Sequence, residues 1–247
     1  WADHIILGIE YLAEDNWLFR AETYYKHFEN LISLNQGQQV TEDDDQVTTT
    51  PFNEFYDTRA YAYGLELLFK KTAGRSRGWI GYTYAKTMKH IQKHGWYFPL
   101  YDRTHTLNIV GDIIISIKNN VHFSTAVQAS SGQPFTPPIG RYDHWQADHD
   151  PYMPAWYWDE ELLVGRKNSE RLPFYFRLDV GLKQKKSIFG IPYERYLQLV
   201  NVTNHVNPLT YQYQAKENRL TGETLGLERA AVPMFPFFFT AGYRIEL

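Results

Sequence analysis

The stretch RAYAYGLELLFKK, residues 59–71, alternates two kinds of side chain with a period of two. One set is Tyr61, Tyr63, Leu65, Leu67 and Phe69, and the other is Ala62, Gly64, Glu66, Leu68 and Lys70. Successive side chains of a β-strand point to opposite faces, so the stretch predicts a strand with one apolar and one more polar face. A helical period does not fit it.

The same alternation recurs along the chain and predicts nine strands. They cover residues 4–12, 16–33, 58–71, 78–89, 103–117, 121–131, 172–186, 191–203 and 235–247. Short and long connections alternate strictly between them. AEDN, TAGRSRG, KNN and SIFG are short and rich in turn formers, whereas residues 34–57, 90–102, 132–171 and 204–234 form long connections.

This sorting is typical of a transmembrane β-barrel, which has tight turns at one rim and long loops at the other. Most of the predicted strands also exceed the about 9–11 residues that cross a bilayer at a tilt. Aromatic residues gather toward the strand ends, as in interfacial girdles: Tyr61, Tyr63, Tyr82, Tyr84, Phe174 and Phe237 near the long loops, and Phe69 and Tyr243 near the turns. We therefore expect an all-β, antiparallel transmembrane β-barrel with short periplasmic turns and long extracellular loops. A soluble β-sandwich is the alternative, because alternation alone does not say which face is inside.

Composition excludes several other classes. The net charge is only -3, without a strong basic patch, which weighs against nucleic-acid binding. Cysteine is absent, so disulfides and thiolate metal sites are excluded. No uninterrupted apolar run reaches the roughly 18 residues of a transmembrane helix. The mean hydropathy of -0.48 is compatible with barrel strands, which are apolar on one face only.

Five motifs, in order, resemble the carboxy-terminal part of the barrel of TonB-dependent outer-membrane receptors of Gram-negative bacteria. They are YGLELLFKKTAGRSRGWIGYTYAKT (63–87), YDRTHTLNIVGDI (101–113), ASSGQPFTPP (129–138), LPFYFRLDVGLKQK with LQLVNVTNHVNP (172–185 and 197–208), and the closing strand MFPFFFTAGYRIEL (234–247). The family's closing strand usually ends in Phe or Trp, whereas this one ends in Leu247.

The resemblance implies a barrel of 22 strands, an amino-terminal plug domain and a motif that contacts TonB. Residues 1–247 are then expected to be a carboxy-terminal barrel segment, with the plug domain and the earlier strands absent. The implied function is active transport of a scarce nutrient, such as a ferric siderophore, cobalamin or glycan, across the cell outer membrane. A structural or adhesive outer-membrane barrel without energised uptake is the alternative. The expected partners are outer-membrane lipid, the plug and remaining strands, TonB through that missing part, and a small-molecule substrate. No cofactor is implied.

The long connections carry the candidate ligand contacts, because flat aromatic rings there offer stacking surfaces to a ligand. The candidates are Trp96, Tyr97, Tyr101, Tyr142, His144, Trp145, Trp156, Tyr157 and Trp158. The same rings are also suited to pack the loops against one another. Asp143, Asp148, His149 and Asp150 have metal-capable side chains, but their spacing matches no known ligand set, so no metal site is expected. The acidic run from Glu42 to Asp45 lacks the ligand order of an EF-hand calcium loop, so we interpret it as a solvated loop tip.

Charged residues on the more polar strand faces are expected to face the barrel lumen. They are Arg20, Glu22, Glu66, Asp112, Arg177, Asp179, Arg244 and Glu246. Such groups can bind a substrate or a plug, but inter-strand ion pairs are the simpler expectation. No Ser-His-Asp set or carboxylate pair has a spacing that indicates catalysis, so the chain is not expected to be an enzyme.

Overall fold

The structure is a computed structural model, and it describes residues 1–13, 16–34, 55–92, 94–147, 156–217 and 224–245. The regular structure of this part is all-β, with sixteen strands. None of the described residues forms a helix that is long and apolar enough to cross a membrane.

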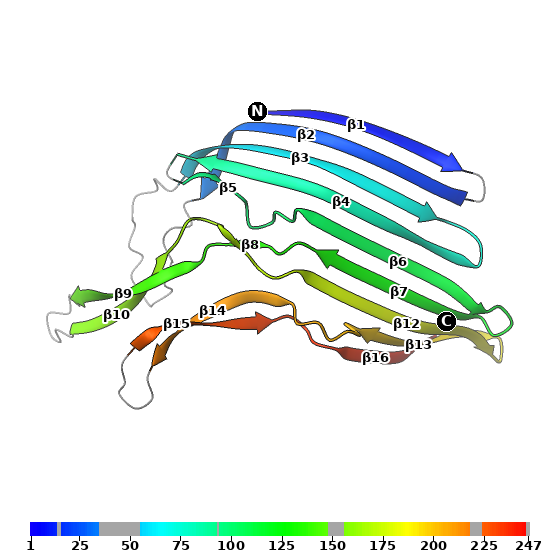
Figure 1. Cartoon of the computed structure of the whole chain (residues 1–247). Helices are drawn as coiled ribbons and strands as arrows, with labels where there is room; N and C mark the ends of the chain where they lie inside the picture. The colour runs from blue at the N-terminus through cyan, green and yellow to red at the C-terminus, as the bar shows by residue number, and fades with distance from the viewer. Residues whose placement is uncertain (14–15, 35–54, 93, 148–155, 218–223, 246–247) are drawn as a thin grey trace.

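Ten strands form one large antiparallel sheet (Figure 1). Nine of them follow one another across the sheet in chain order, so the path is a meander, and β5 pairs with β4 off this path. The strands are β1 (Ala2–Ala13), β2 (Trp17–Leu34), β3 (Phe55–Lys71), β4 (Ser76–Ile91), β5 (Gly95–Tyr97), β6 (His105–Ser116), β7 (Val121–Ser130), β12 (Tyr175–Ile188), β13 (Ile191–Val200) and β16 (Phe238–Ile245). Short turns gather at one end of the sheet and the long connections at the other.

Three two-stranded sheets occupy the long connections. They pair β8 (Pro134–Phe135) with β11 (Glu170–Arg171), β9 (Pro138–Ala147) with β10 (Trp156–Val164), and β14 (Pro208–Glu217) with β15 (Thr224–Pro233). The last two are hairpins that extend from the loop end of the large sheet (Figure 1).

Each of the nine segments predicted from the sequence overlaps one strand of the meander, and the bounds differ by up to three residues, as at Phe55. The sequence did not predict the seven other strands, which were assigned to long connections. These strands are short or loop-borne, and they carry no clean alternation over an apolar face.

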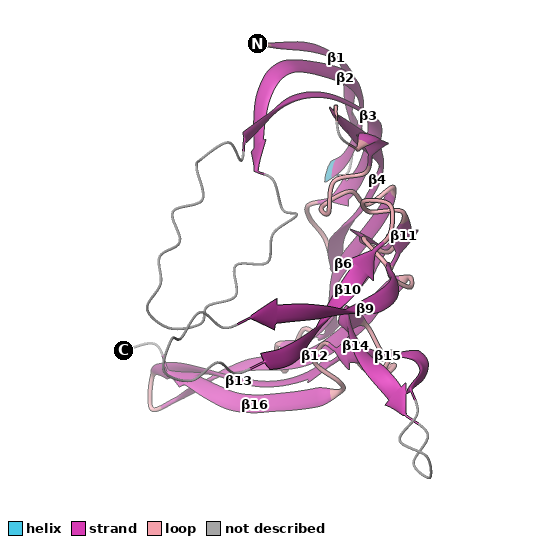
Figure 2. Cartoon of the chain, turned by 90° about the vertical axis from the view of Figure 1, so that its left-hand side faces the viewer, coloured by secondary structure: helices cyan, strands magenta, loops and turns pink. Residues whose placement is uncertain are grey.

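The large sheet is a single curved layer that is open on one side (Figure 2). Within the described residues, β1 and β16 each pair with only one neighbour of this sheet. An unpaired strand edge leaves a row of backbone N–H and C=O groups without partners.

The register gathers the apolar side chains on one face. One row across the sheet runs from Ile9 through Ala21, Leu67 and Tyr82 to Leu107. The next row on the same face runs from Tyr11 through Phe19, Phe69 and Ile80 to Ile109. Residues one position along each strand lie on the opposite face, which we call the polar face.

No second layer covers the apolar face in the described part of the chain, and its large side chains are exposed. Leu7 is 72% exposed, Ile9 71% and Phe239 68%. A soluble sandwich would bury these residues between two sheets about 10 Å apart. The described residues contain no such stacked pair of sheets (Figure 2).

Candidate functional site

The polar face carries the charged residues that the sequence assigned to one side of the strands. Strand register places the described ones on a single face: Arg20, Glu22, Glu66, Asp112, Arg177, Asp179 and Arg244. Glu246 lies outside the described residues. The two ends of this face differ in chemistry, and each forms a separate group of contacts.

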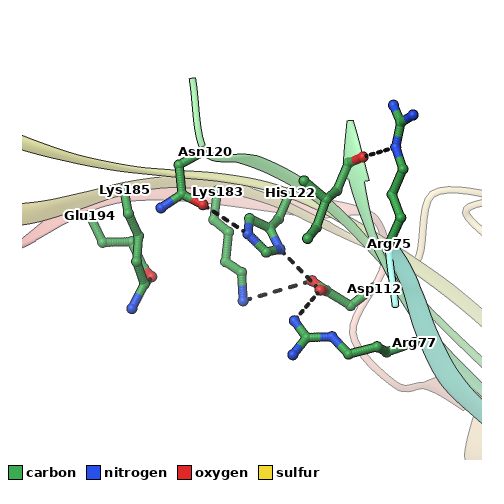
Figure 3. A network of polar contacts seen from close by, with 9 residues as sticks. Arg75, Arg77, Asp112, Asn120, His122, Lys183, Lys185 and Glu194 are labelled. Carbon is green, nitrogen blue, oxygen red and sulfur yellow. Dashed lines mark hydrogen bonds and ion pairs between the residues drawn. The ribbon is translucent and has the colours of Figure 1, made fainter. Parts of the chain in front are cut away.

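At the end with the short turns, Asp112 lies among the side chains of Arg77, Lys183 and His122 (Figure 3). Its Oδ1 is 3.0 Å from Arg77 Nη2 and 3.0 Å from His122 Nδ1, and its Oδ2 is 3.8 Å from Lys183 Nζ. The other ring nitrogen of His122, Nε2, lies 3.1 Å from Asn120 Oδ1. Because both ring nitrogens face oxygens, a protonated His122 can donate to both at once.

Glu194 is also shared between two cations, at 3.7 Å from Lys185 Nζ and 3.9 Å from Arg244 Nη1. We call the whole group the turn-end charge cluster. It consists of Arg77, Asp112, His122, Lys183, Lys185, Glu194 and Arg244. Its four fixed cations exceed its two carboxylates, so this end of the polar face is predominantly positive. The sequence identified Asp112 and Arg244 here but not His122, Lys183 or Glu194, which only the strand register brings together.

At the loop end, a buried ion pair ties the connections to the sheet. Arg171 Nη2 donates to Asp102 Oδ2 at 2.6 Å, and the Asp102 side chain is 1% exposed. The backbone N–H of Thr87 donates to Asp102 Oδ1 at 2.8 Å, and Arg171 Nη1 donates to the carbonyl oxygen of Gly132 at 3.1 Å. These contacts join β4 to the segments around residues 102, 132 and 171. The sequence analysis did not identify either partner of this pair.

Gly132 lies at the closest approach of this region. A Cβ atom on Gly132 would come within 1.6 Å of the Leu172 carbonyl oxygen. Only glycine fits such a close backbone contact without a shift of the chain. This explains the glycine of the SSGQPF segment in structural terms.

A second buried group lies where β13 ends. Arg177 donates to Asp179 on the same strand, and Asp179 Oδ1 accepts from the backbone N–H of Asn201 at 2.9 Å. Asn201 has a φ of 51° and is 1% exposed, and its side chain donates to His205 O at 3.1 Å. The expectation of inter-strand ion pairs is therefore wrong for Arg177 and Asp179, because their pair lies within one strand and holds a chain reversal. Inter-strand ion pairs are present for Arg20 with Glu10, for Asp112 with Arg77 and for Arg244 with Glu194.

The three aromatic candidates around β5 do not lie on one face of the sheet. Tyr97 pairs with Lys89, which on its other side pairs with Ala60, so Tyr97 lies on the polar face, and it is 7% exposed. Trp96 is on the opposite face of the strand, where its ring lies 5.0 Å from that of Tyr61. Tyr101, in the following connection, is 64% exposed. Adjacent positions on a strand point to opposite faces, which explains why Trp96 and Tyr97 lie on different sides of the sheet.

Two lysines contact the tyrosines on the polar side. Lys167 Nζ lies 4.7 Å from the centroid of the Tyr97 ring, and Lys89 Nζ lies 5.6 Å from that of Tyr101. Burial, and then the nearby charge of Lys89, lower the pKa of the Lys167 ammonium. Burial is also the main cause that raises the pKa of the Tyr97 hydroxyl. Neither lysine forms an ion pair with a carboxylate among the described residues, so this group carries positive charge that an anionic ligand would offset.

The remaining aromatic candidates lie in the β9–β10 hairpin. Its backbone register pairs Trp145 with Trp158 and His144 with Asp159. The side chains of Tyr142, His144, Trp145, Trp156, Tyr157 and Trp158 lie outside the description, as do residues 42–45 and 148–150 entirely. Across the described residues, no group of three His, Cys, Asp or Glu side chains could hold a metal ion.

No family model matches the chain, and no curated protein matches it. The family resemblance therefore rests on the five motifs alone.

We predict that Asp102→Ala will destabilise the folded protein by about 3 kcal/mol, because it leaves the half-buried Arg171 charge and the Thr87 N–H without their partner. Denaturant unfolding of the variant and the parent measures the difference. Glu170→Gln is the control, because the Glu170–Arg229 pair is exposed and spans 3.9 Å, and it should cost less than about 1 kcal/mol. Equal effects of the two variants would contradict the role given to Asp102.

We predict that Lys167 reacts with amine-acylating reagents at lower pH than a lysine in a free peptide. A lowered pKa means that more of the amine is neutral, and hence nucleophilic, at a given pH. Mass spectrometry of tryptic peptides across a pH series measures the reaction midpoint. Lys89→Gln should move the midpoint only part of the way upward, because burial is the larger cause. Lys70→Gln, at the opposite end of β3, should leave it in place, and a midpoint at the free-peptide value would refute the assignment.

Proposed function

We propose that the chain forms part of the wall of an outer-membrane β-barrel, with the apolar face toward lipid and the polar face toward the lumen. The observation that carries the proposal is the exposed, single-layer apolar face. Burying a large aliphatic side chain is worth roughly 1.5–3 kcal/mol, so an uncovered row of them is unstable in water. Hydrocarbon removes that penalty, and the barrel is the one sheet architecture that spans a membrane.

The order of side chains along the apolar face supports this orientation. On β3 it begins near the loops with Tyr61 and Tyr63, continues with Leu65 and Leu67, and ends near the turn with Lys71. Lys71 Nζ lies 4.8 Å from the centroid of the Trp17 ring. Aromatic and basic groups at both ends of an aliphatic band are the arrangement found at membrane–water interfaces. Tyr82 is an exception to the girdle expected from the sequence, because it lies opposite Leu67 within the band.

The open edges β1 and β16 support closure by further strands, because an unpaired edge in lipid leaves backbone groups unsatisfied. Together with the five motifs, this favours a carboxy-terminal part of a 22-stranded TonB-dependent receptor. The function we propose is active uptake of a scarce nutrient across the outer membrane, driven through TonB. In this assignment the turn-end charge cluster faces the plug domain, and Tyr97, Tyr101, Lys89 and Lys167 face the vestibule where the substrate is captured.

Leu67 and Leu68 are adjacent and point to opposite faces, so they test the orientation directly. The chain has no cysteine, and Leu67→Cys and Leu68→Cys each introduce one thiol for an environment-sensitive fluorophore. In vesicles that contain brominated lipids, we predict strong quenching of the label at position 67 and weak quenching at position 68. The reason is that hydrocarbon contacts only the apolar face.

Both variants should fold to the same extent, since each label sits on an accessible face of the same strand. A soluble sandwich gives no brominated-lipid quenching at either position. The reverse pattern, with stronger quenching at 68, would show that the polar face meets lipid and would refute the barrel orientation.

We predict that deletion of the gene slows growth when iron, cobalamin or a specific glycan is limiting, and that the wild-type gene restores it. Growth curves under each limitation identify the substrate class. Unchanged growth under all three, with normal quenching at position 67, would favour a structural or adhesive barrel instead of a transporter.

A further inference from the structure

The apolar face ends in a group of basic and aromatic residues near the loops, which we call the basic–aromatic rim. It consists of Arg59, Tyr61, Tyr63, Lys86, His90 and Trp96. Strand pairing fixes them on one face: Arg59 is opposite His90, His90 is opposite Trp96, and Tyr63 is opposite Lys86. The rim therefore lies on the face that we assign to lipid, not on the lumenal face that carries Tyr97.

The rings of the rim form a connected surface. Trp96 lies 5.0 Å from Tyr61 and 5.1 Å from His90, measured between ring centroids. The rings of Tyr61 and Tyr63 are nearly parallel, at 9° and 6.3 Å. Trp96 is nevertheless 42% exposed, so the packing of these rings against one another leaves a free aromatic surface.

The two fixed cations of the rim have no acidic partner in the described residues. No ion pair there includes Arg59 or Lys86, and Lys86 Nζ instead lies 5.6 Å from the centroid of the Phe98 ring. Arginine binds phosphate oxygens with two parallel hydrogen bonds, and lysine binds them as a point charge. Their positions on a lipid-facing surface call for an anion that belongs to the lipid.

The order of side chains along β3 indicates which kind of anion the rim binds. Arg59 comes first, then Tyr61 and Tyr63, and then the aliphatic Leu65 and Leu67. A membrane lipid presents the same order of groups: charged phosphate, polar headgroup and acyl chain. Arg59 at the charged surface and Tyr61, Tyr63 and Trp96 at headgroup level follow this order, and Lys86 lies opposite Tyr63, at headgroup level.

We propose that the basic–aromatic rim binds the phosphate groups of a phosphorylated lipid headgroup at the loop side of the membrane. Arg59 and Lys86 contact the phosphates, Tyr61, Tyr63 and Trp96 pack on the headgroup, and the aliphatic band below them contacts the acyl chains. The inference rests on the proposed membrane orientation and is separate from substrate uptake, which uses the polar face.

The test uses the complete gene product in detergent, with lipid A that carries two phosphates and the same lipid after dephosphorylation. Native mass spectrometry measures the bound lipid over a concentration series. We expect the phosphorylated lipid to bind more tightly, and Arg59→Gln combined with Lys86→Gln to weaken its binding roughly tenfold to thirtyfold. The double variant should bind the dephosphorylated lipid as the parent does.

The matched control combines Lys26→Gln with Lys70→Gln, which removes two cations from the polar face of the neighbouring strands β2 and β3. It should leave lipid A binding unchanged. An equal loss in the control, or no loss in the rim variant, overturns the inference. Displacement of lipid A by inorganic phosphate alone overturns it too, because the rim would then be a simple anion site. Quenching at position 67 in the same preparations separates the two proposals: normal quenching with unchanged lipid A binding refutes only the rim, and absent quenching refutes both.

Discussion

A single β-layer with one uncovered apolar face is the constraint on which the rest of this structure depends. Backbone hydrogen bonds run from strand to strand and satisfy the interior of the sheet, but no second layer formed by the described residues packs against the apolar side chains. Leu7 and Ile9, both more than two-thirds exposed, are typical of that face. In water, the exposed apolar face therefore destabilises the sheet. An apolar medium that covers this face removes the penalty.

The two ends of the sheet differ in how accessible their charged and polar side chains are. At the turn end, charges remain partly accessible and cations outnumber carboxylates, as the pairs of Asp112 and Glu194 show. At the loop end, Asp102 and Asn201 are buried and hold the connections through hydrogen bonds to backbone groups. A single-layer sheet has no interior core to hold its loops, so buried polar anchors perform that task.

The strand meander could be predicted from the sequence because alternation over long segments leaves a clear period of two. Pairing of Leu197 with Leu182 and of Leu199 with Val180 places both leucines on the apolar face. The loop-end anchors could not be predicted, because Asp102 and Arg171 are 69 positions apart and meet only through folding. The opposite faces of Trp96 and Tyr97 could not be predicted for a different reason, since a three-residue strand is too short to show which face each ring takes.

The chain-order path of the large sheet has a consequence for how it assembles. Within each tight hairpin, such as β3–β4 or β6–β7, partners are close in sequence, so closure costs little entropy and pairing is quick. Long connections separate four of the neighbouring strand pairs. The two longest are residues 131–174, between β7 and β12, and residues 201–237, between β13 and β16. Strand addition should therefore be slowest at these two junctions. Partly formed sheets that end at β7 or β13 are the intermediates most prone to mispairing before the next strand is added.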